Sequence, residues 1–242
     1  MHACLHTTKE KNLTYYKIGN GNKFVVLLHG WGASAKLMFP IVKVIGEYTY
    51  LVPDLYGHGL TPHPDTPLAV TDYVDGVMDI IKEEKIDSAI FICHSFGGRL
   101  GVYIASHYPK LVDRLILCNS AGLRPKRGVK YYIKRANFII RRKLGLNTDG
   151  CGSSEYRALD KVMKKTFSNV VTYYQDNVLG GIVAPTLIVW GGKDRVTPPY
   201  MARRFYKNIP NSRLCIFKKV GHFSYAEDLK TFKKVVVDFL EN

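Results

Sequence analysis

This sequence lacks the features of membrane, secreted and metal-scaffolded proteins. No window reaches the roughly 18 uninterrupted apolar residues of a transmembrane helix. The opening MHACLHTTKEKN also lacks the long apolar segment of a signal peptide. Cysteine is scarce and forms no CxxC pair, which argues against a disulfide framework or a zinc knuckle; the five residues are Cys4, Cys93, Cys118, Cys151 and Cys215. We therefore expect a cytoplasmic protein with reduced thiols and no stable membrane insertion.

Acidic residues are also few beside basic ones. The chain has 20 Asp and Glu against 35 Lys and Arg, a formal net charge of +15 at pH 7. Such an excess favours an anionic partner, such as nucleic acid, an acidic membrane surface or an acidic substrate. A basic surface that only keeps the protein in solution is the simpler explanation. Because no recognised nucleic-acid-binding module is present, we expect no nucleic-acid partner.

The 242 residues, 46% of them hydrophobic, are enough for one large α/β domain with a small insertion. Apolar runs of strand length are continuous rather than alternating, which predicts strands buried on both faces; they begin at Phe24, Tyr50, Ala89, Arg114, Thr186 and Arg213. Helical patterns lie between most of them, over residues 72–85, 97–108, 201–209 and 228–242. This alternation predicts an α/β fold with a mostly parallel, doubly wound sheet.

Local signals predict some element boundaries. Thr71 is expected to cap the first of these helices, and Pro109 to end the second. Residues 13–28 read as strand, turn and strand, with GNGN at 19–22 as a hairpin turn. Residues 123–182 contain helical patterns but no good buried strand.

We expect two helices in this last segment, over residues 129–145 and 153–171, with Ser153 or Ser154 capping the second. The predicted organisation is therefore a core formed by residues 1–122 and 183–242 and a helical cap formed by residues 123–182.

The stretch ICHSFGG, residues 92–98, places Ser95 where a buried strand ends and a helix begins. Cys93 and Gly97 keep small residues two positions before and after it, as a sharp strand-to-helix turn requires. Glycine is usual at the first position of this motif, so Cys93 is a small departure. Ser95 is either an ordinary helix cap or a nucleophile held on an elbow.

A nucleophilic serine needs a base and a group that orients the base. His222 follows the last predicted strand, and Asp194 follows the strand before it. Both loops should lie at the carboxyl edge of the sheet with Ser95. Taken separately, Asp194 could be an ordinary turn residue, and His222 could be a loop residue without a functional role. Together with Ser95 they have the chain order and strand ends of a catalytic triad.

The oxyanion of acyl transfer needs two aimed N–H donors. The backbone amide of Phe96, directly after Ser95, is one candidate. The other comes from HGWG after the first core strand, where we assign the Trp31 amide. Glycines beside it allow close approach to a substrate, although an ordinary glycine-rich turn would look the same.

These motifs together resemble the α/β-hydrolase superfamily along nearly the whole chain. The matching stretches are HGWG, DLYGHGLT, CHSFGG, GGKDRVTP and GHFSYAED. The resemblance implies the α/β-hydrolase fold, with the insertion as its helical cap. Some relatives carry the triad acid after the preceding strand, but here that strand ends at Asn119, so Asp194 keeps the role. Dehalogenating relatives use an aspartate nucleophile, which Ser95 argues against.

The resemblance implies a serine esterase with a catalytic triad, a nucleophile elbow, an oxyanion hole and a cap domain. We expect hydrolysis of small or medium acyl esters through an acyl-enzyme. Two alternatives stay open: carbon–carbon bond hydrolysis of an anionic diketone-like acid, or a ligand-binding receptor that keeps the fold. No cofactor or metal is expected, because no carboxylate or cysteine cluster joins His58 and His63.

The expected partner is a small-molecule ester or related acyl compound, anionic compounds included, and the expected state is a monomer or homodimer. Candidate substrate-binding residues are His29, Gly30, His94, Arg124, Tyr131 and Tyr132. The basic residues between Arg124 and Lys143 could attract an anion, lie on an acidic membrane or form a solvated face. Aromatic residues of the cap could line an acyl pocket or form the cap's own core: Tyr131, Tyr132, Phe138, Tyr173 and Tyr174.

Overall fold

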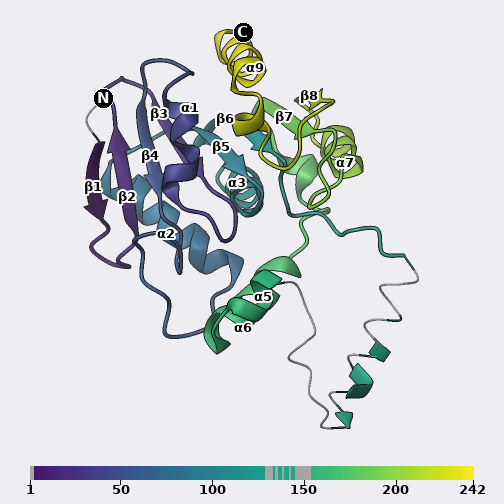
Figure 1. Ribbon diagram of the computed structural model, residues 1–242. Coiled ribbons are helices and arrows are strands. Elements are labelled where there is room, and N and C mark those ends of the chain that lie inside the picture. Colours follow the sequence, from purple (N-terminus) through teal and green to yellow (C-terminus); the bar gives the residue numbers. More distant parts are fainter. Residues whose placement is uncertain (1–2, 129–132, 134–135, 138, 142, 145–153) are drawn as a thin grey trace.

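The structure, a computed structural model, describes residues 3–128, 133, 136–137, 139–141, 143–144 and 154–242 (Figure 1). Its centre is an eight-stranded sheet with the order β1-β2-β4-β3-β5-β6-β7-β8. The strands are β1 (Ala3–Thr7), β2 (Thr14–Ile18), β3 (Phe24–Leu28), β4 (Thr49–Pro53), β5 (Ala89–His94), β6 (Val112–Cys118), β7 (Thr186–Gly191) and β8 (Ser212–Phe217). β2 pairs antiparallel with β1 and β4, and all other pairs are parallel.

The central strands are mostly apolar because both faces of the sheet are covered. In β3, Val26 and Leu28 belong to the core on one face, and Val25 and Leu27 to the core on the other. One face is covered by α2 (Val70–Glu83), α3 (Phe96–His107) and α7 (Tyr200–Asn208). The other is covered by α1 (Phe39–Val42), α8 (Ser224–Glu227) and α9 (Leu229–Glu241). The predicted doubly wound, mostly parallel α/β fold is confirmed.

The predicted hairpin at GNGN is wrong. β4 lies between β2 and β3, and β2 instead forms a hairpin with β1. The glycines serve a different contact: a Cβ at Gly19 would lie 2.3 Å from the Tyr48 carbonyl oxygen, and one at Gly21 would lie 2.5 Å from that of Glu47. The segment is therefore glycine-rich because it packs against the backbone that leads into β4.

One predicted helix start is wrong, and another predicted helix is interrupted. α2 begins at Val70, with the Ala69 N–H donating to the Asp72 carboxylate at 2.6 Å, so Thr71 is inside the helix rather than its cap. The helix predicted over 153–171 is two helices, α5 (Ser154–Ala158) and α6 (Lys161–Val171). Asp160 starts the second by accepting the Met163 N–H at 2.8 Å. Most of the helix predicted over 129–145 lies outside the described residues.

α6 is tied to the core, which fixes it beside the carboxyl edge of the sheet. The Leu68 N–H donates to the Thr166 hydroxyl at 3.0 Å, and the Asn169 amide donates to the Leu68 carbonyl at 3.1 Å. His63 contacts the Asp160 carboxylate at 3.0 Å. A short 3₁₀ turn, η2 (Leu179–Gly181), leads the chain back to β7. In the described ranges, no helix has both the length and the apolar character to span a bilayer.

Candidate active site

Ser95 lies on a sharp turn between β5 and α3. Its backbone has φ 50° and ψ −110°, a conformation that L residues rarely adopt. Cβ atoms added at Gly97 and Gly98 would lie 2.2 Å from the Leu28 carbonyl oxygen and 2.1 Å from the Ser120 hydroxyl. The turn therefore depends on glycine after the serine and holds the Ser95 side chain at the carboxyl end of the sheet.

Gly97→Ala is expected to lower the free energy of unfolding by about 2–3 kcal/mol, because the new methyl group meets backbone rather than a movable side chain. Guanidinium denaturation followed by circular dichroism would measure this. Gly180→Ala is the matched control, since no heavy atom of the described residues, apart from its own chain neighbours, lies within 4 Å of its added Cβ. Equal stability of the two variants would contradict the steric explanation.

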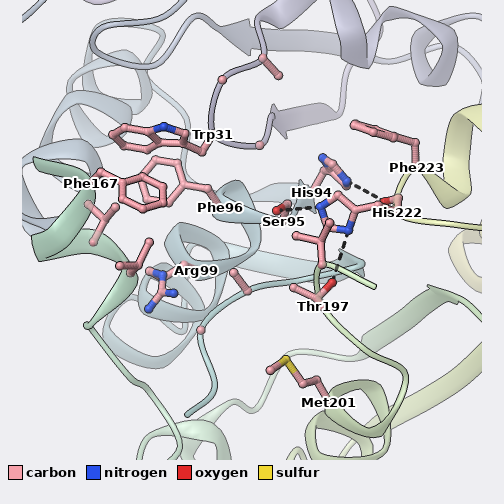
Figure 2. A pocket seen from close by; sticks show the side chains of 18 of the residues that line it. Trp31, His94, Ser95, Phe96, Arg99, Phe167, Thr197, Met201, His222 and Phe223 are labelled. Atoms are coloured by element: carbon pink, nitrogen blue, oxygen red, sulfur yellow. Dashed lines mark hydrogen bonds between the residues drawn. The ribbon is translucent and has the colours of Figure 1, made fainter. Parts of the chain in front are cut away.

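Figure 2 shows the side chains of Ser95 and His222 pointing toward each other. His222 Nε2 lies 3.1 Å from Ser95 Oγ, and its Nδ1 lies 2.8 Å from Asp194 Oδ2. With the Nδ1–H donating to the carboxylate, Nε2 is left to accept the serine proton. The loops after β7 and β8 carry Asp194 and His222, so the topology brings the three predicted residues together.

The Asp194 carboxylate is buried and accepts from donors on both oxygens. Oδ2 accepts from Asn119 Nδ2 at 2.6 Å and from the Thr197 hydroxyl at 2.7 Å, besides His222. Oδ1 accepts the N–H groups of Val196 at 2.8 Å and Thr197 at 3.0 Å. Burial raises the pKa of Asp194, but the hydrogen bonds from His222, Asn119 and Thr197 outweigh it and lower the pKa to about 2. The group is therefore ionised at neutral pH.

Asn119 and Thr197 were not predicted as site residues. In the sequence, Asn119 stood out only because it occupies a strand end where some relatives carry the triad acid. The structure places its side-chain amide against the carboxylate of Asp194, which follows the next strand. Asn119 also adopts φ 48°, which asparagine tolerates better than most residues. Thr197 gave no separate signal.

The two amides predicted to bind an oxyanion lie at the cavity beside Ser95. Among the described residues, neither the Trp31 N–H nor the Phe96 N–H has an acceptor, and both residues line the cavity beside Ser95. A Cβ at Gly30 would lie 3.2 Å from the Ser95 Cβ, so the loop after β3 approaches the serine closely. The arrangement offers two free donors next to a hydroxyl.

The two histidines that flank the serine are neutral and differ in position. His29 does not line the cavity; its Nε2 accepts the Leu55 N–H at 3.0 Å, and its Nδ1 lies 2.7 Å from the Gly30 carbonyl. His94 lines the cavity, and its Nε2 donates to the His222 carbonyl at 2.9 Å. Burial lowers the pKa of both imidazoles to about 3. His29 thus supports the loop, and His94 supports the His222 backbone.

A cavity of about 1020 Å³ opens at Ser95. Its lining is mainly apolar, with α6 contributing Phe167, Val170 and Val171; Trp31, Phe96, Leu123, Tyr174, Met201 and Phe223 complete most of it. Among the described residues, the lining contains two cationic side chains, Lys36 and Arg99, and no carboxylate. The shape and chemistry suit a small, largely apolar molecule.

The remaining candidates for substrate binding have different positions. Gly30 lines the cavity, but Arg124 does not; its guanidinium lies over the ring of Tyr174, 5.3 Å from the centroid. Tyr173 packs against the core, whereas Tyr174 lines the cavity. The other cap aromatics that we singled out lie outside the described residues: Tyr131, Tyr132 and Phe138.

Comparisons with known proteins agree with this architecture. Residues 25–232 match the model of the "Alpha/beta hydrolase family". A 2-hydroxy-6-oxo-6-(2'-aminophenyl)hexa-2,4-dienoic acid hydrolase of Metapseudomonas resinovorans is 27% identical, over 93% of this chain and 86% of the relative. A pimeloyl-[acyl-carrier protein] methyl ester esterase of Neisseria meningitidis serogroup C is 26% identical, over 90% of this chain and 94% of the relative. A solved esterase from Exiguobacterium antarcticum has a TM-score of 0.76 at 20% identity, over 100% of both chains.

Proposed function

This chain belongs to the alpha/beta hydrolase family, and from that premise we propose that it cleaves carboxylic esters of small or medium acyl groups through an acyl-enzyme. The observation that carries the proposal is the continuous contact from Ser95 Oγ through His222 to Asp194. In this proposal Ser95 is the nucleophile, His222 the general base and Asp194 the group that orients the imidazole.

The proposed reaction has two stages. His222 Nε2 takes the hydroxyl proton as Ser95 Oγ attacks the carbonyl carbon, and the amides of Trp31 and Phe96 bind the resulting oxyanion. The protonated imidazole then gives its proton to the leaving alcohol as the ester bond breaks. Water, deprotonated by the same nitrogen, then attacks the acyl carbon. The bond from that carbon to Ser95 Oγ breaks, Oγ takes the proton back from His222, and the acid is released. Asp194 stays ionised throughout, consistent with its depressed pKa.

We further propose that residues 123–182 act as a cap over the cavity and that the core is formed by 1–122 and 183–242. Leu123, Pro125, Phe167 and Tyr174 from this segment line the cavity. The acyl group would pack among these side chains and Trp31, so the cap would set the acyl-chain length.

A second candidate is hydrolysis of a carbon–carbon bond in an anionic diketone-like acid. It is favoured by the two cationic side chains in the cavity lining, Lys36 and Arg99, and by the similarity to the dienoic acid hydrolase. This reaction would use the same serine, histidine and aspartate. It predicts fast turnover of a vinylogous diketone acid and poor turnover of simple esters.

The test is hydrolysis of 4-nitrophenyl esters from acetate to decanoate by the wild type. We expect turnover with an optimum at a short or medium acyl chain, because the cavity is finite and mainly apolar. A vinylogous diketone acid is assayed in parallel. Turnover of that acid without turnover of any ester would replace the first proposal by the second. No turnover of either by a folded protein would favour a ligand-binding receptor.

A further inference from the structure

Arg99 is a buried cation at the cavity that the proposed reaction does not use. The residue is 5% exposed, and its side chain lines the cavity. Burying a guanidinium is unfavourable unless an anion or several acceptors surround it. We therefore expect an anion or several hydrogen-bond acceptors to contact the Arg99 guanidinium.

The described residues supply only one partner. An Arg99 Nη1 group donates to the carbonyl oxygen of Tyr173, just beyond the C-terminus of α6. No described carboxylate pairs with Arg99, and Asp176, three residues after Tyr173 in the chain, is engaged by Arg204. A guanidinium has five N–H donors, so most of its hydrogen-bonding capacity stays unused at the cavity wall. Burial lowers the pKa of Arg99 to about 10, which keeps it protonated at neutral pH.

A second buried polar group beside Arg99 also lacks partners. Gln175 is 2% exposed, and among the described residues neither its amide oxygen nor its amide nitrogen has a hydrogen-bond partner. A Cβ placed at Gly122, which lines the cavity, would lie 3.1 Å from Gln175 Oε1 and 3.9 Å from the Arg99 Cα. Next to Gly122, the cavity wall thus has a buried amide whose oxygen and NH₂ both lack partners among the described residues, close to the backbone of Arg99.

The position of Arg99 relative to the proposed nucleophile is fixed by α3. Arg99 follows Ser95 by four residues, about one helical turn or 5–6 Å along the axis. In Figure 2, Arg99 and His222 lie on opposite sides of Ser95. A bound ester would thus meet the imidazole on one side and the guanidinium on the other.

We propose that Arg99 binds a carboxylate of the substrate, so that the preferred esters are anionic. This deepens the proposed ester hydrolysis and rests on it. Guanidinium and carboxylate form two parallel N–H···O hydrogen bonds, and the apolar lining strengthens such a pair. The carboxylate belongs either to the acyl group, as in a monoester of a dicarboxylic acid, or to the alcohol, as in an ester of a hydroxy acid.

Paired substrates test the proposal and separate the two positions of the charge. Mono-4-nitrophenyl glutarate is compared with 4-nitrophenyl valerate, and the butyrate ester of 4-hydroxybenzoic acid with phenyl butyrate. For the wild type we expect kcat/KM to be at least about 10-fold higher for the anionic member of one pair. Arg99→Gln should lower that anionic-to-neutral ratio by at least about 10-fold, so that the preference is lost. Arg99→Lys should keep part of the preference.

Arg203→Gln is the matched control, because it removes the same charge from an exposed position of α7. This control distinguishes binding of the anionic ester at Arg99 from general attraction of the ester by the positively charged protein surface. If both variants change the ratio equally, or if Arg99→Gln lowers both rates and leaves the ratio unchanged, the proposal is overturned. A wild type without any anionic preference overturns it even when Arg99→Gln does not fold.

A binding measurement separates failure of this proposal from failure of the proposed function. Glutarate should raise the Tm of Ser95→Ala and should not raise that of Arg99→Gln. Glutarate binding that depends on Arg99, in a protein that hydrolyses no ester, would retain the anion site and reject ester cleavage. Ester turnover with no preference for anionic esters and no glutarate binding would retain ester cleavage and reject the anion site.

Discussion

Replacing Ser95 by alanine is expected to lower kcat for ester hydrolysis by about 10⁴- to 10⁶-fold. The variant keeps the imidazole, the carboxylate and both free amides, but it has no oxygen to attack the carbonyl. What remains is the smaller acceleration from binding and from the oxyanion donors. The measurement is burst and steady-state kinetics on the best ester of the acyl series.

Stability distinguishes lost chemistry from lost structure. Ser95→Ala should keep the wild-type Tm, because the alanine retains the Cβ and the same strained backbone. Ser95→Gly should be equally inactive and about 1 kcal/mol more stable, since glycine adopts φ 50° without strain. An active Ser95→Ala, or covalent labelling by a fluorophosphonate at a residue other than Ser95, would contradict the assignment of the nucleophile.

The strands of the core were predictable because each carries its own signal. A run such as residues 89–93 of β5 is apolar at every position only if both faces of the sheet are covered, and β5 is buried throughout. Pairing was less predictable, because it depends on segments far apart in sequence. The glycines at 19–22 are needed for packing against residues 47–48, and nothing local distinguishes this from a hairpin turn.

The proposed triad was predictable for a topological reason. Loops that follow parallel strands meet at one edge of the sheet, so Ser95, Asp194 and His222 had to be neighbours once the strands were placed. The residues that support them carry no such signal. Asn119 and Arg99 look like an ordinary strand end and a surface helix residue until the packing of α6 and of the loop after β7 is known.

Asp194→Asn is expected to lower kcat about 10⁴-fold while leaving KM much less affected. Every group that contacts the carboxylate is a donor: His222 Nδ1, Asn119 Nδ2, the Thr197 hydroxyl and two backbone N–H groups. An asparagine must direct its NH₂ at some of these donors. The backbone N–H groups of Val196 and Thr197 cannot rotate, so the NH₂ will face the His222 side.

That orientation forces His222 to accept at Nδ1 and therefore to carry its proton on Nε2. The imidazole then donates toward Ser95 Oγ and cannot take the serine proton, which is why the loss falls on kcat. Asp113→Asn, a change of the same charge at an exposed position of β6, is the control and should leave kcat unchanged. A kcat for Asp194→Asn within 10-fold of the wild type would mean that another group orients the imidazole.

The same substitution should also change the dependence of stability on pH. The pKa of Asp194 falls from 3.8 to about 2 on folding, so the ionised group stabilises the protein above pH 4, by about 2 kcal/mol, and this contribution is lost as the pH falls to 2. Asp194→Asn lacks it at every pH. The difference in unfolding free energy between wild type and variant should therefore be largest at neutral pH and shrink between pH 4 and pH 2. If the difference in unfolding free energy did not depend on pH, the Asp194 side chain would stabilise the protein through its packing rather than through its charge.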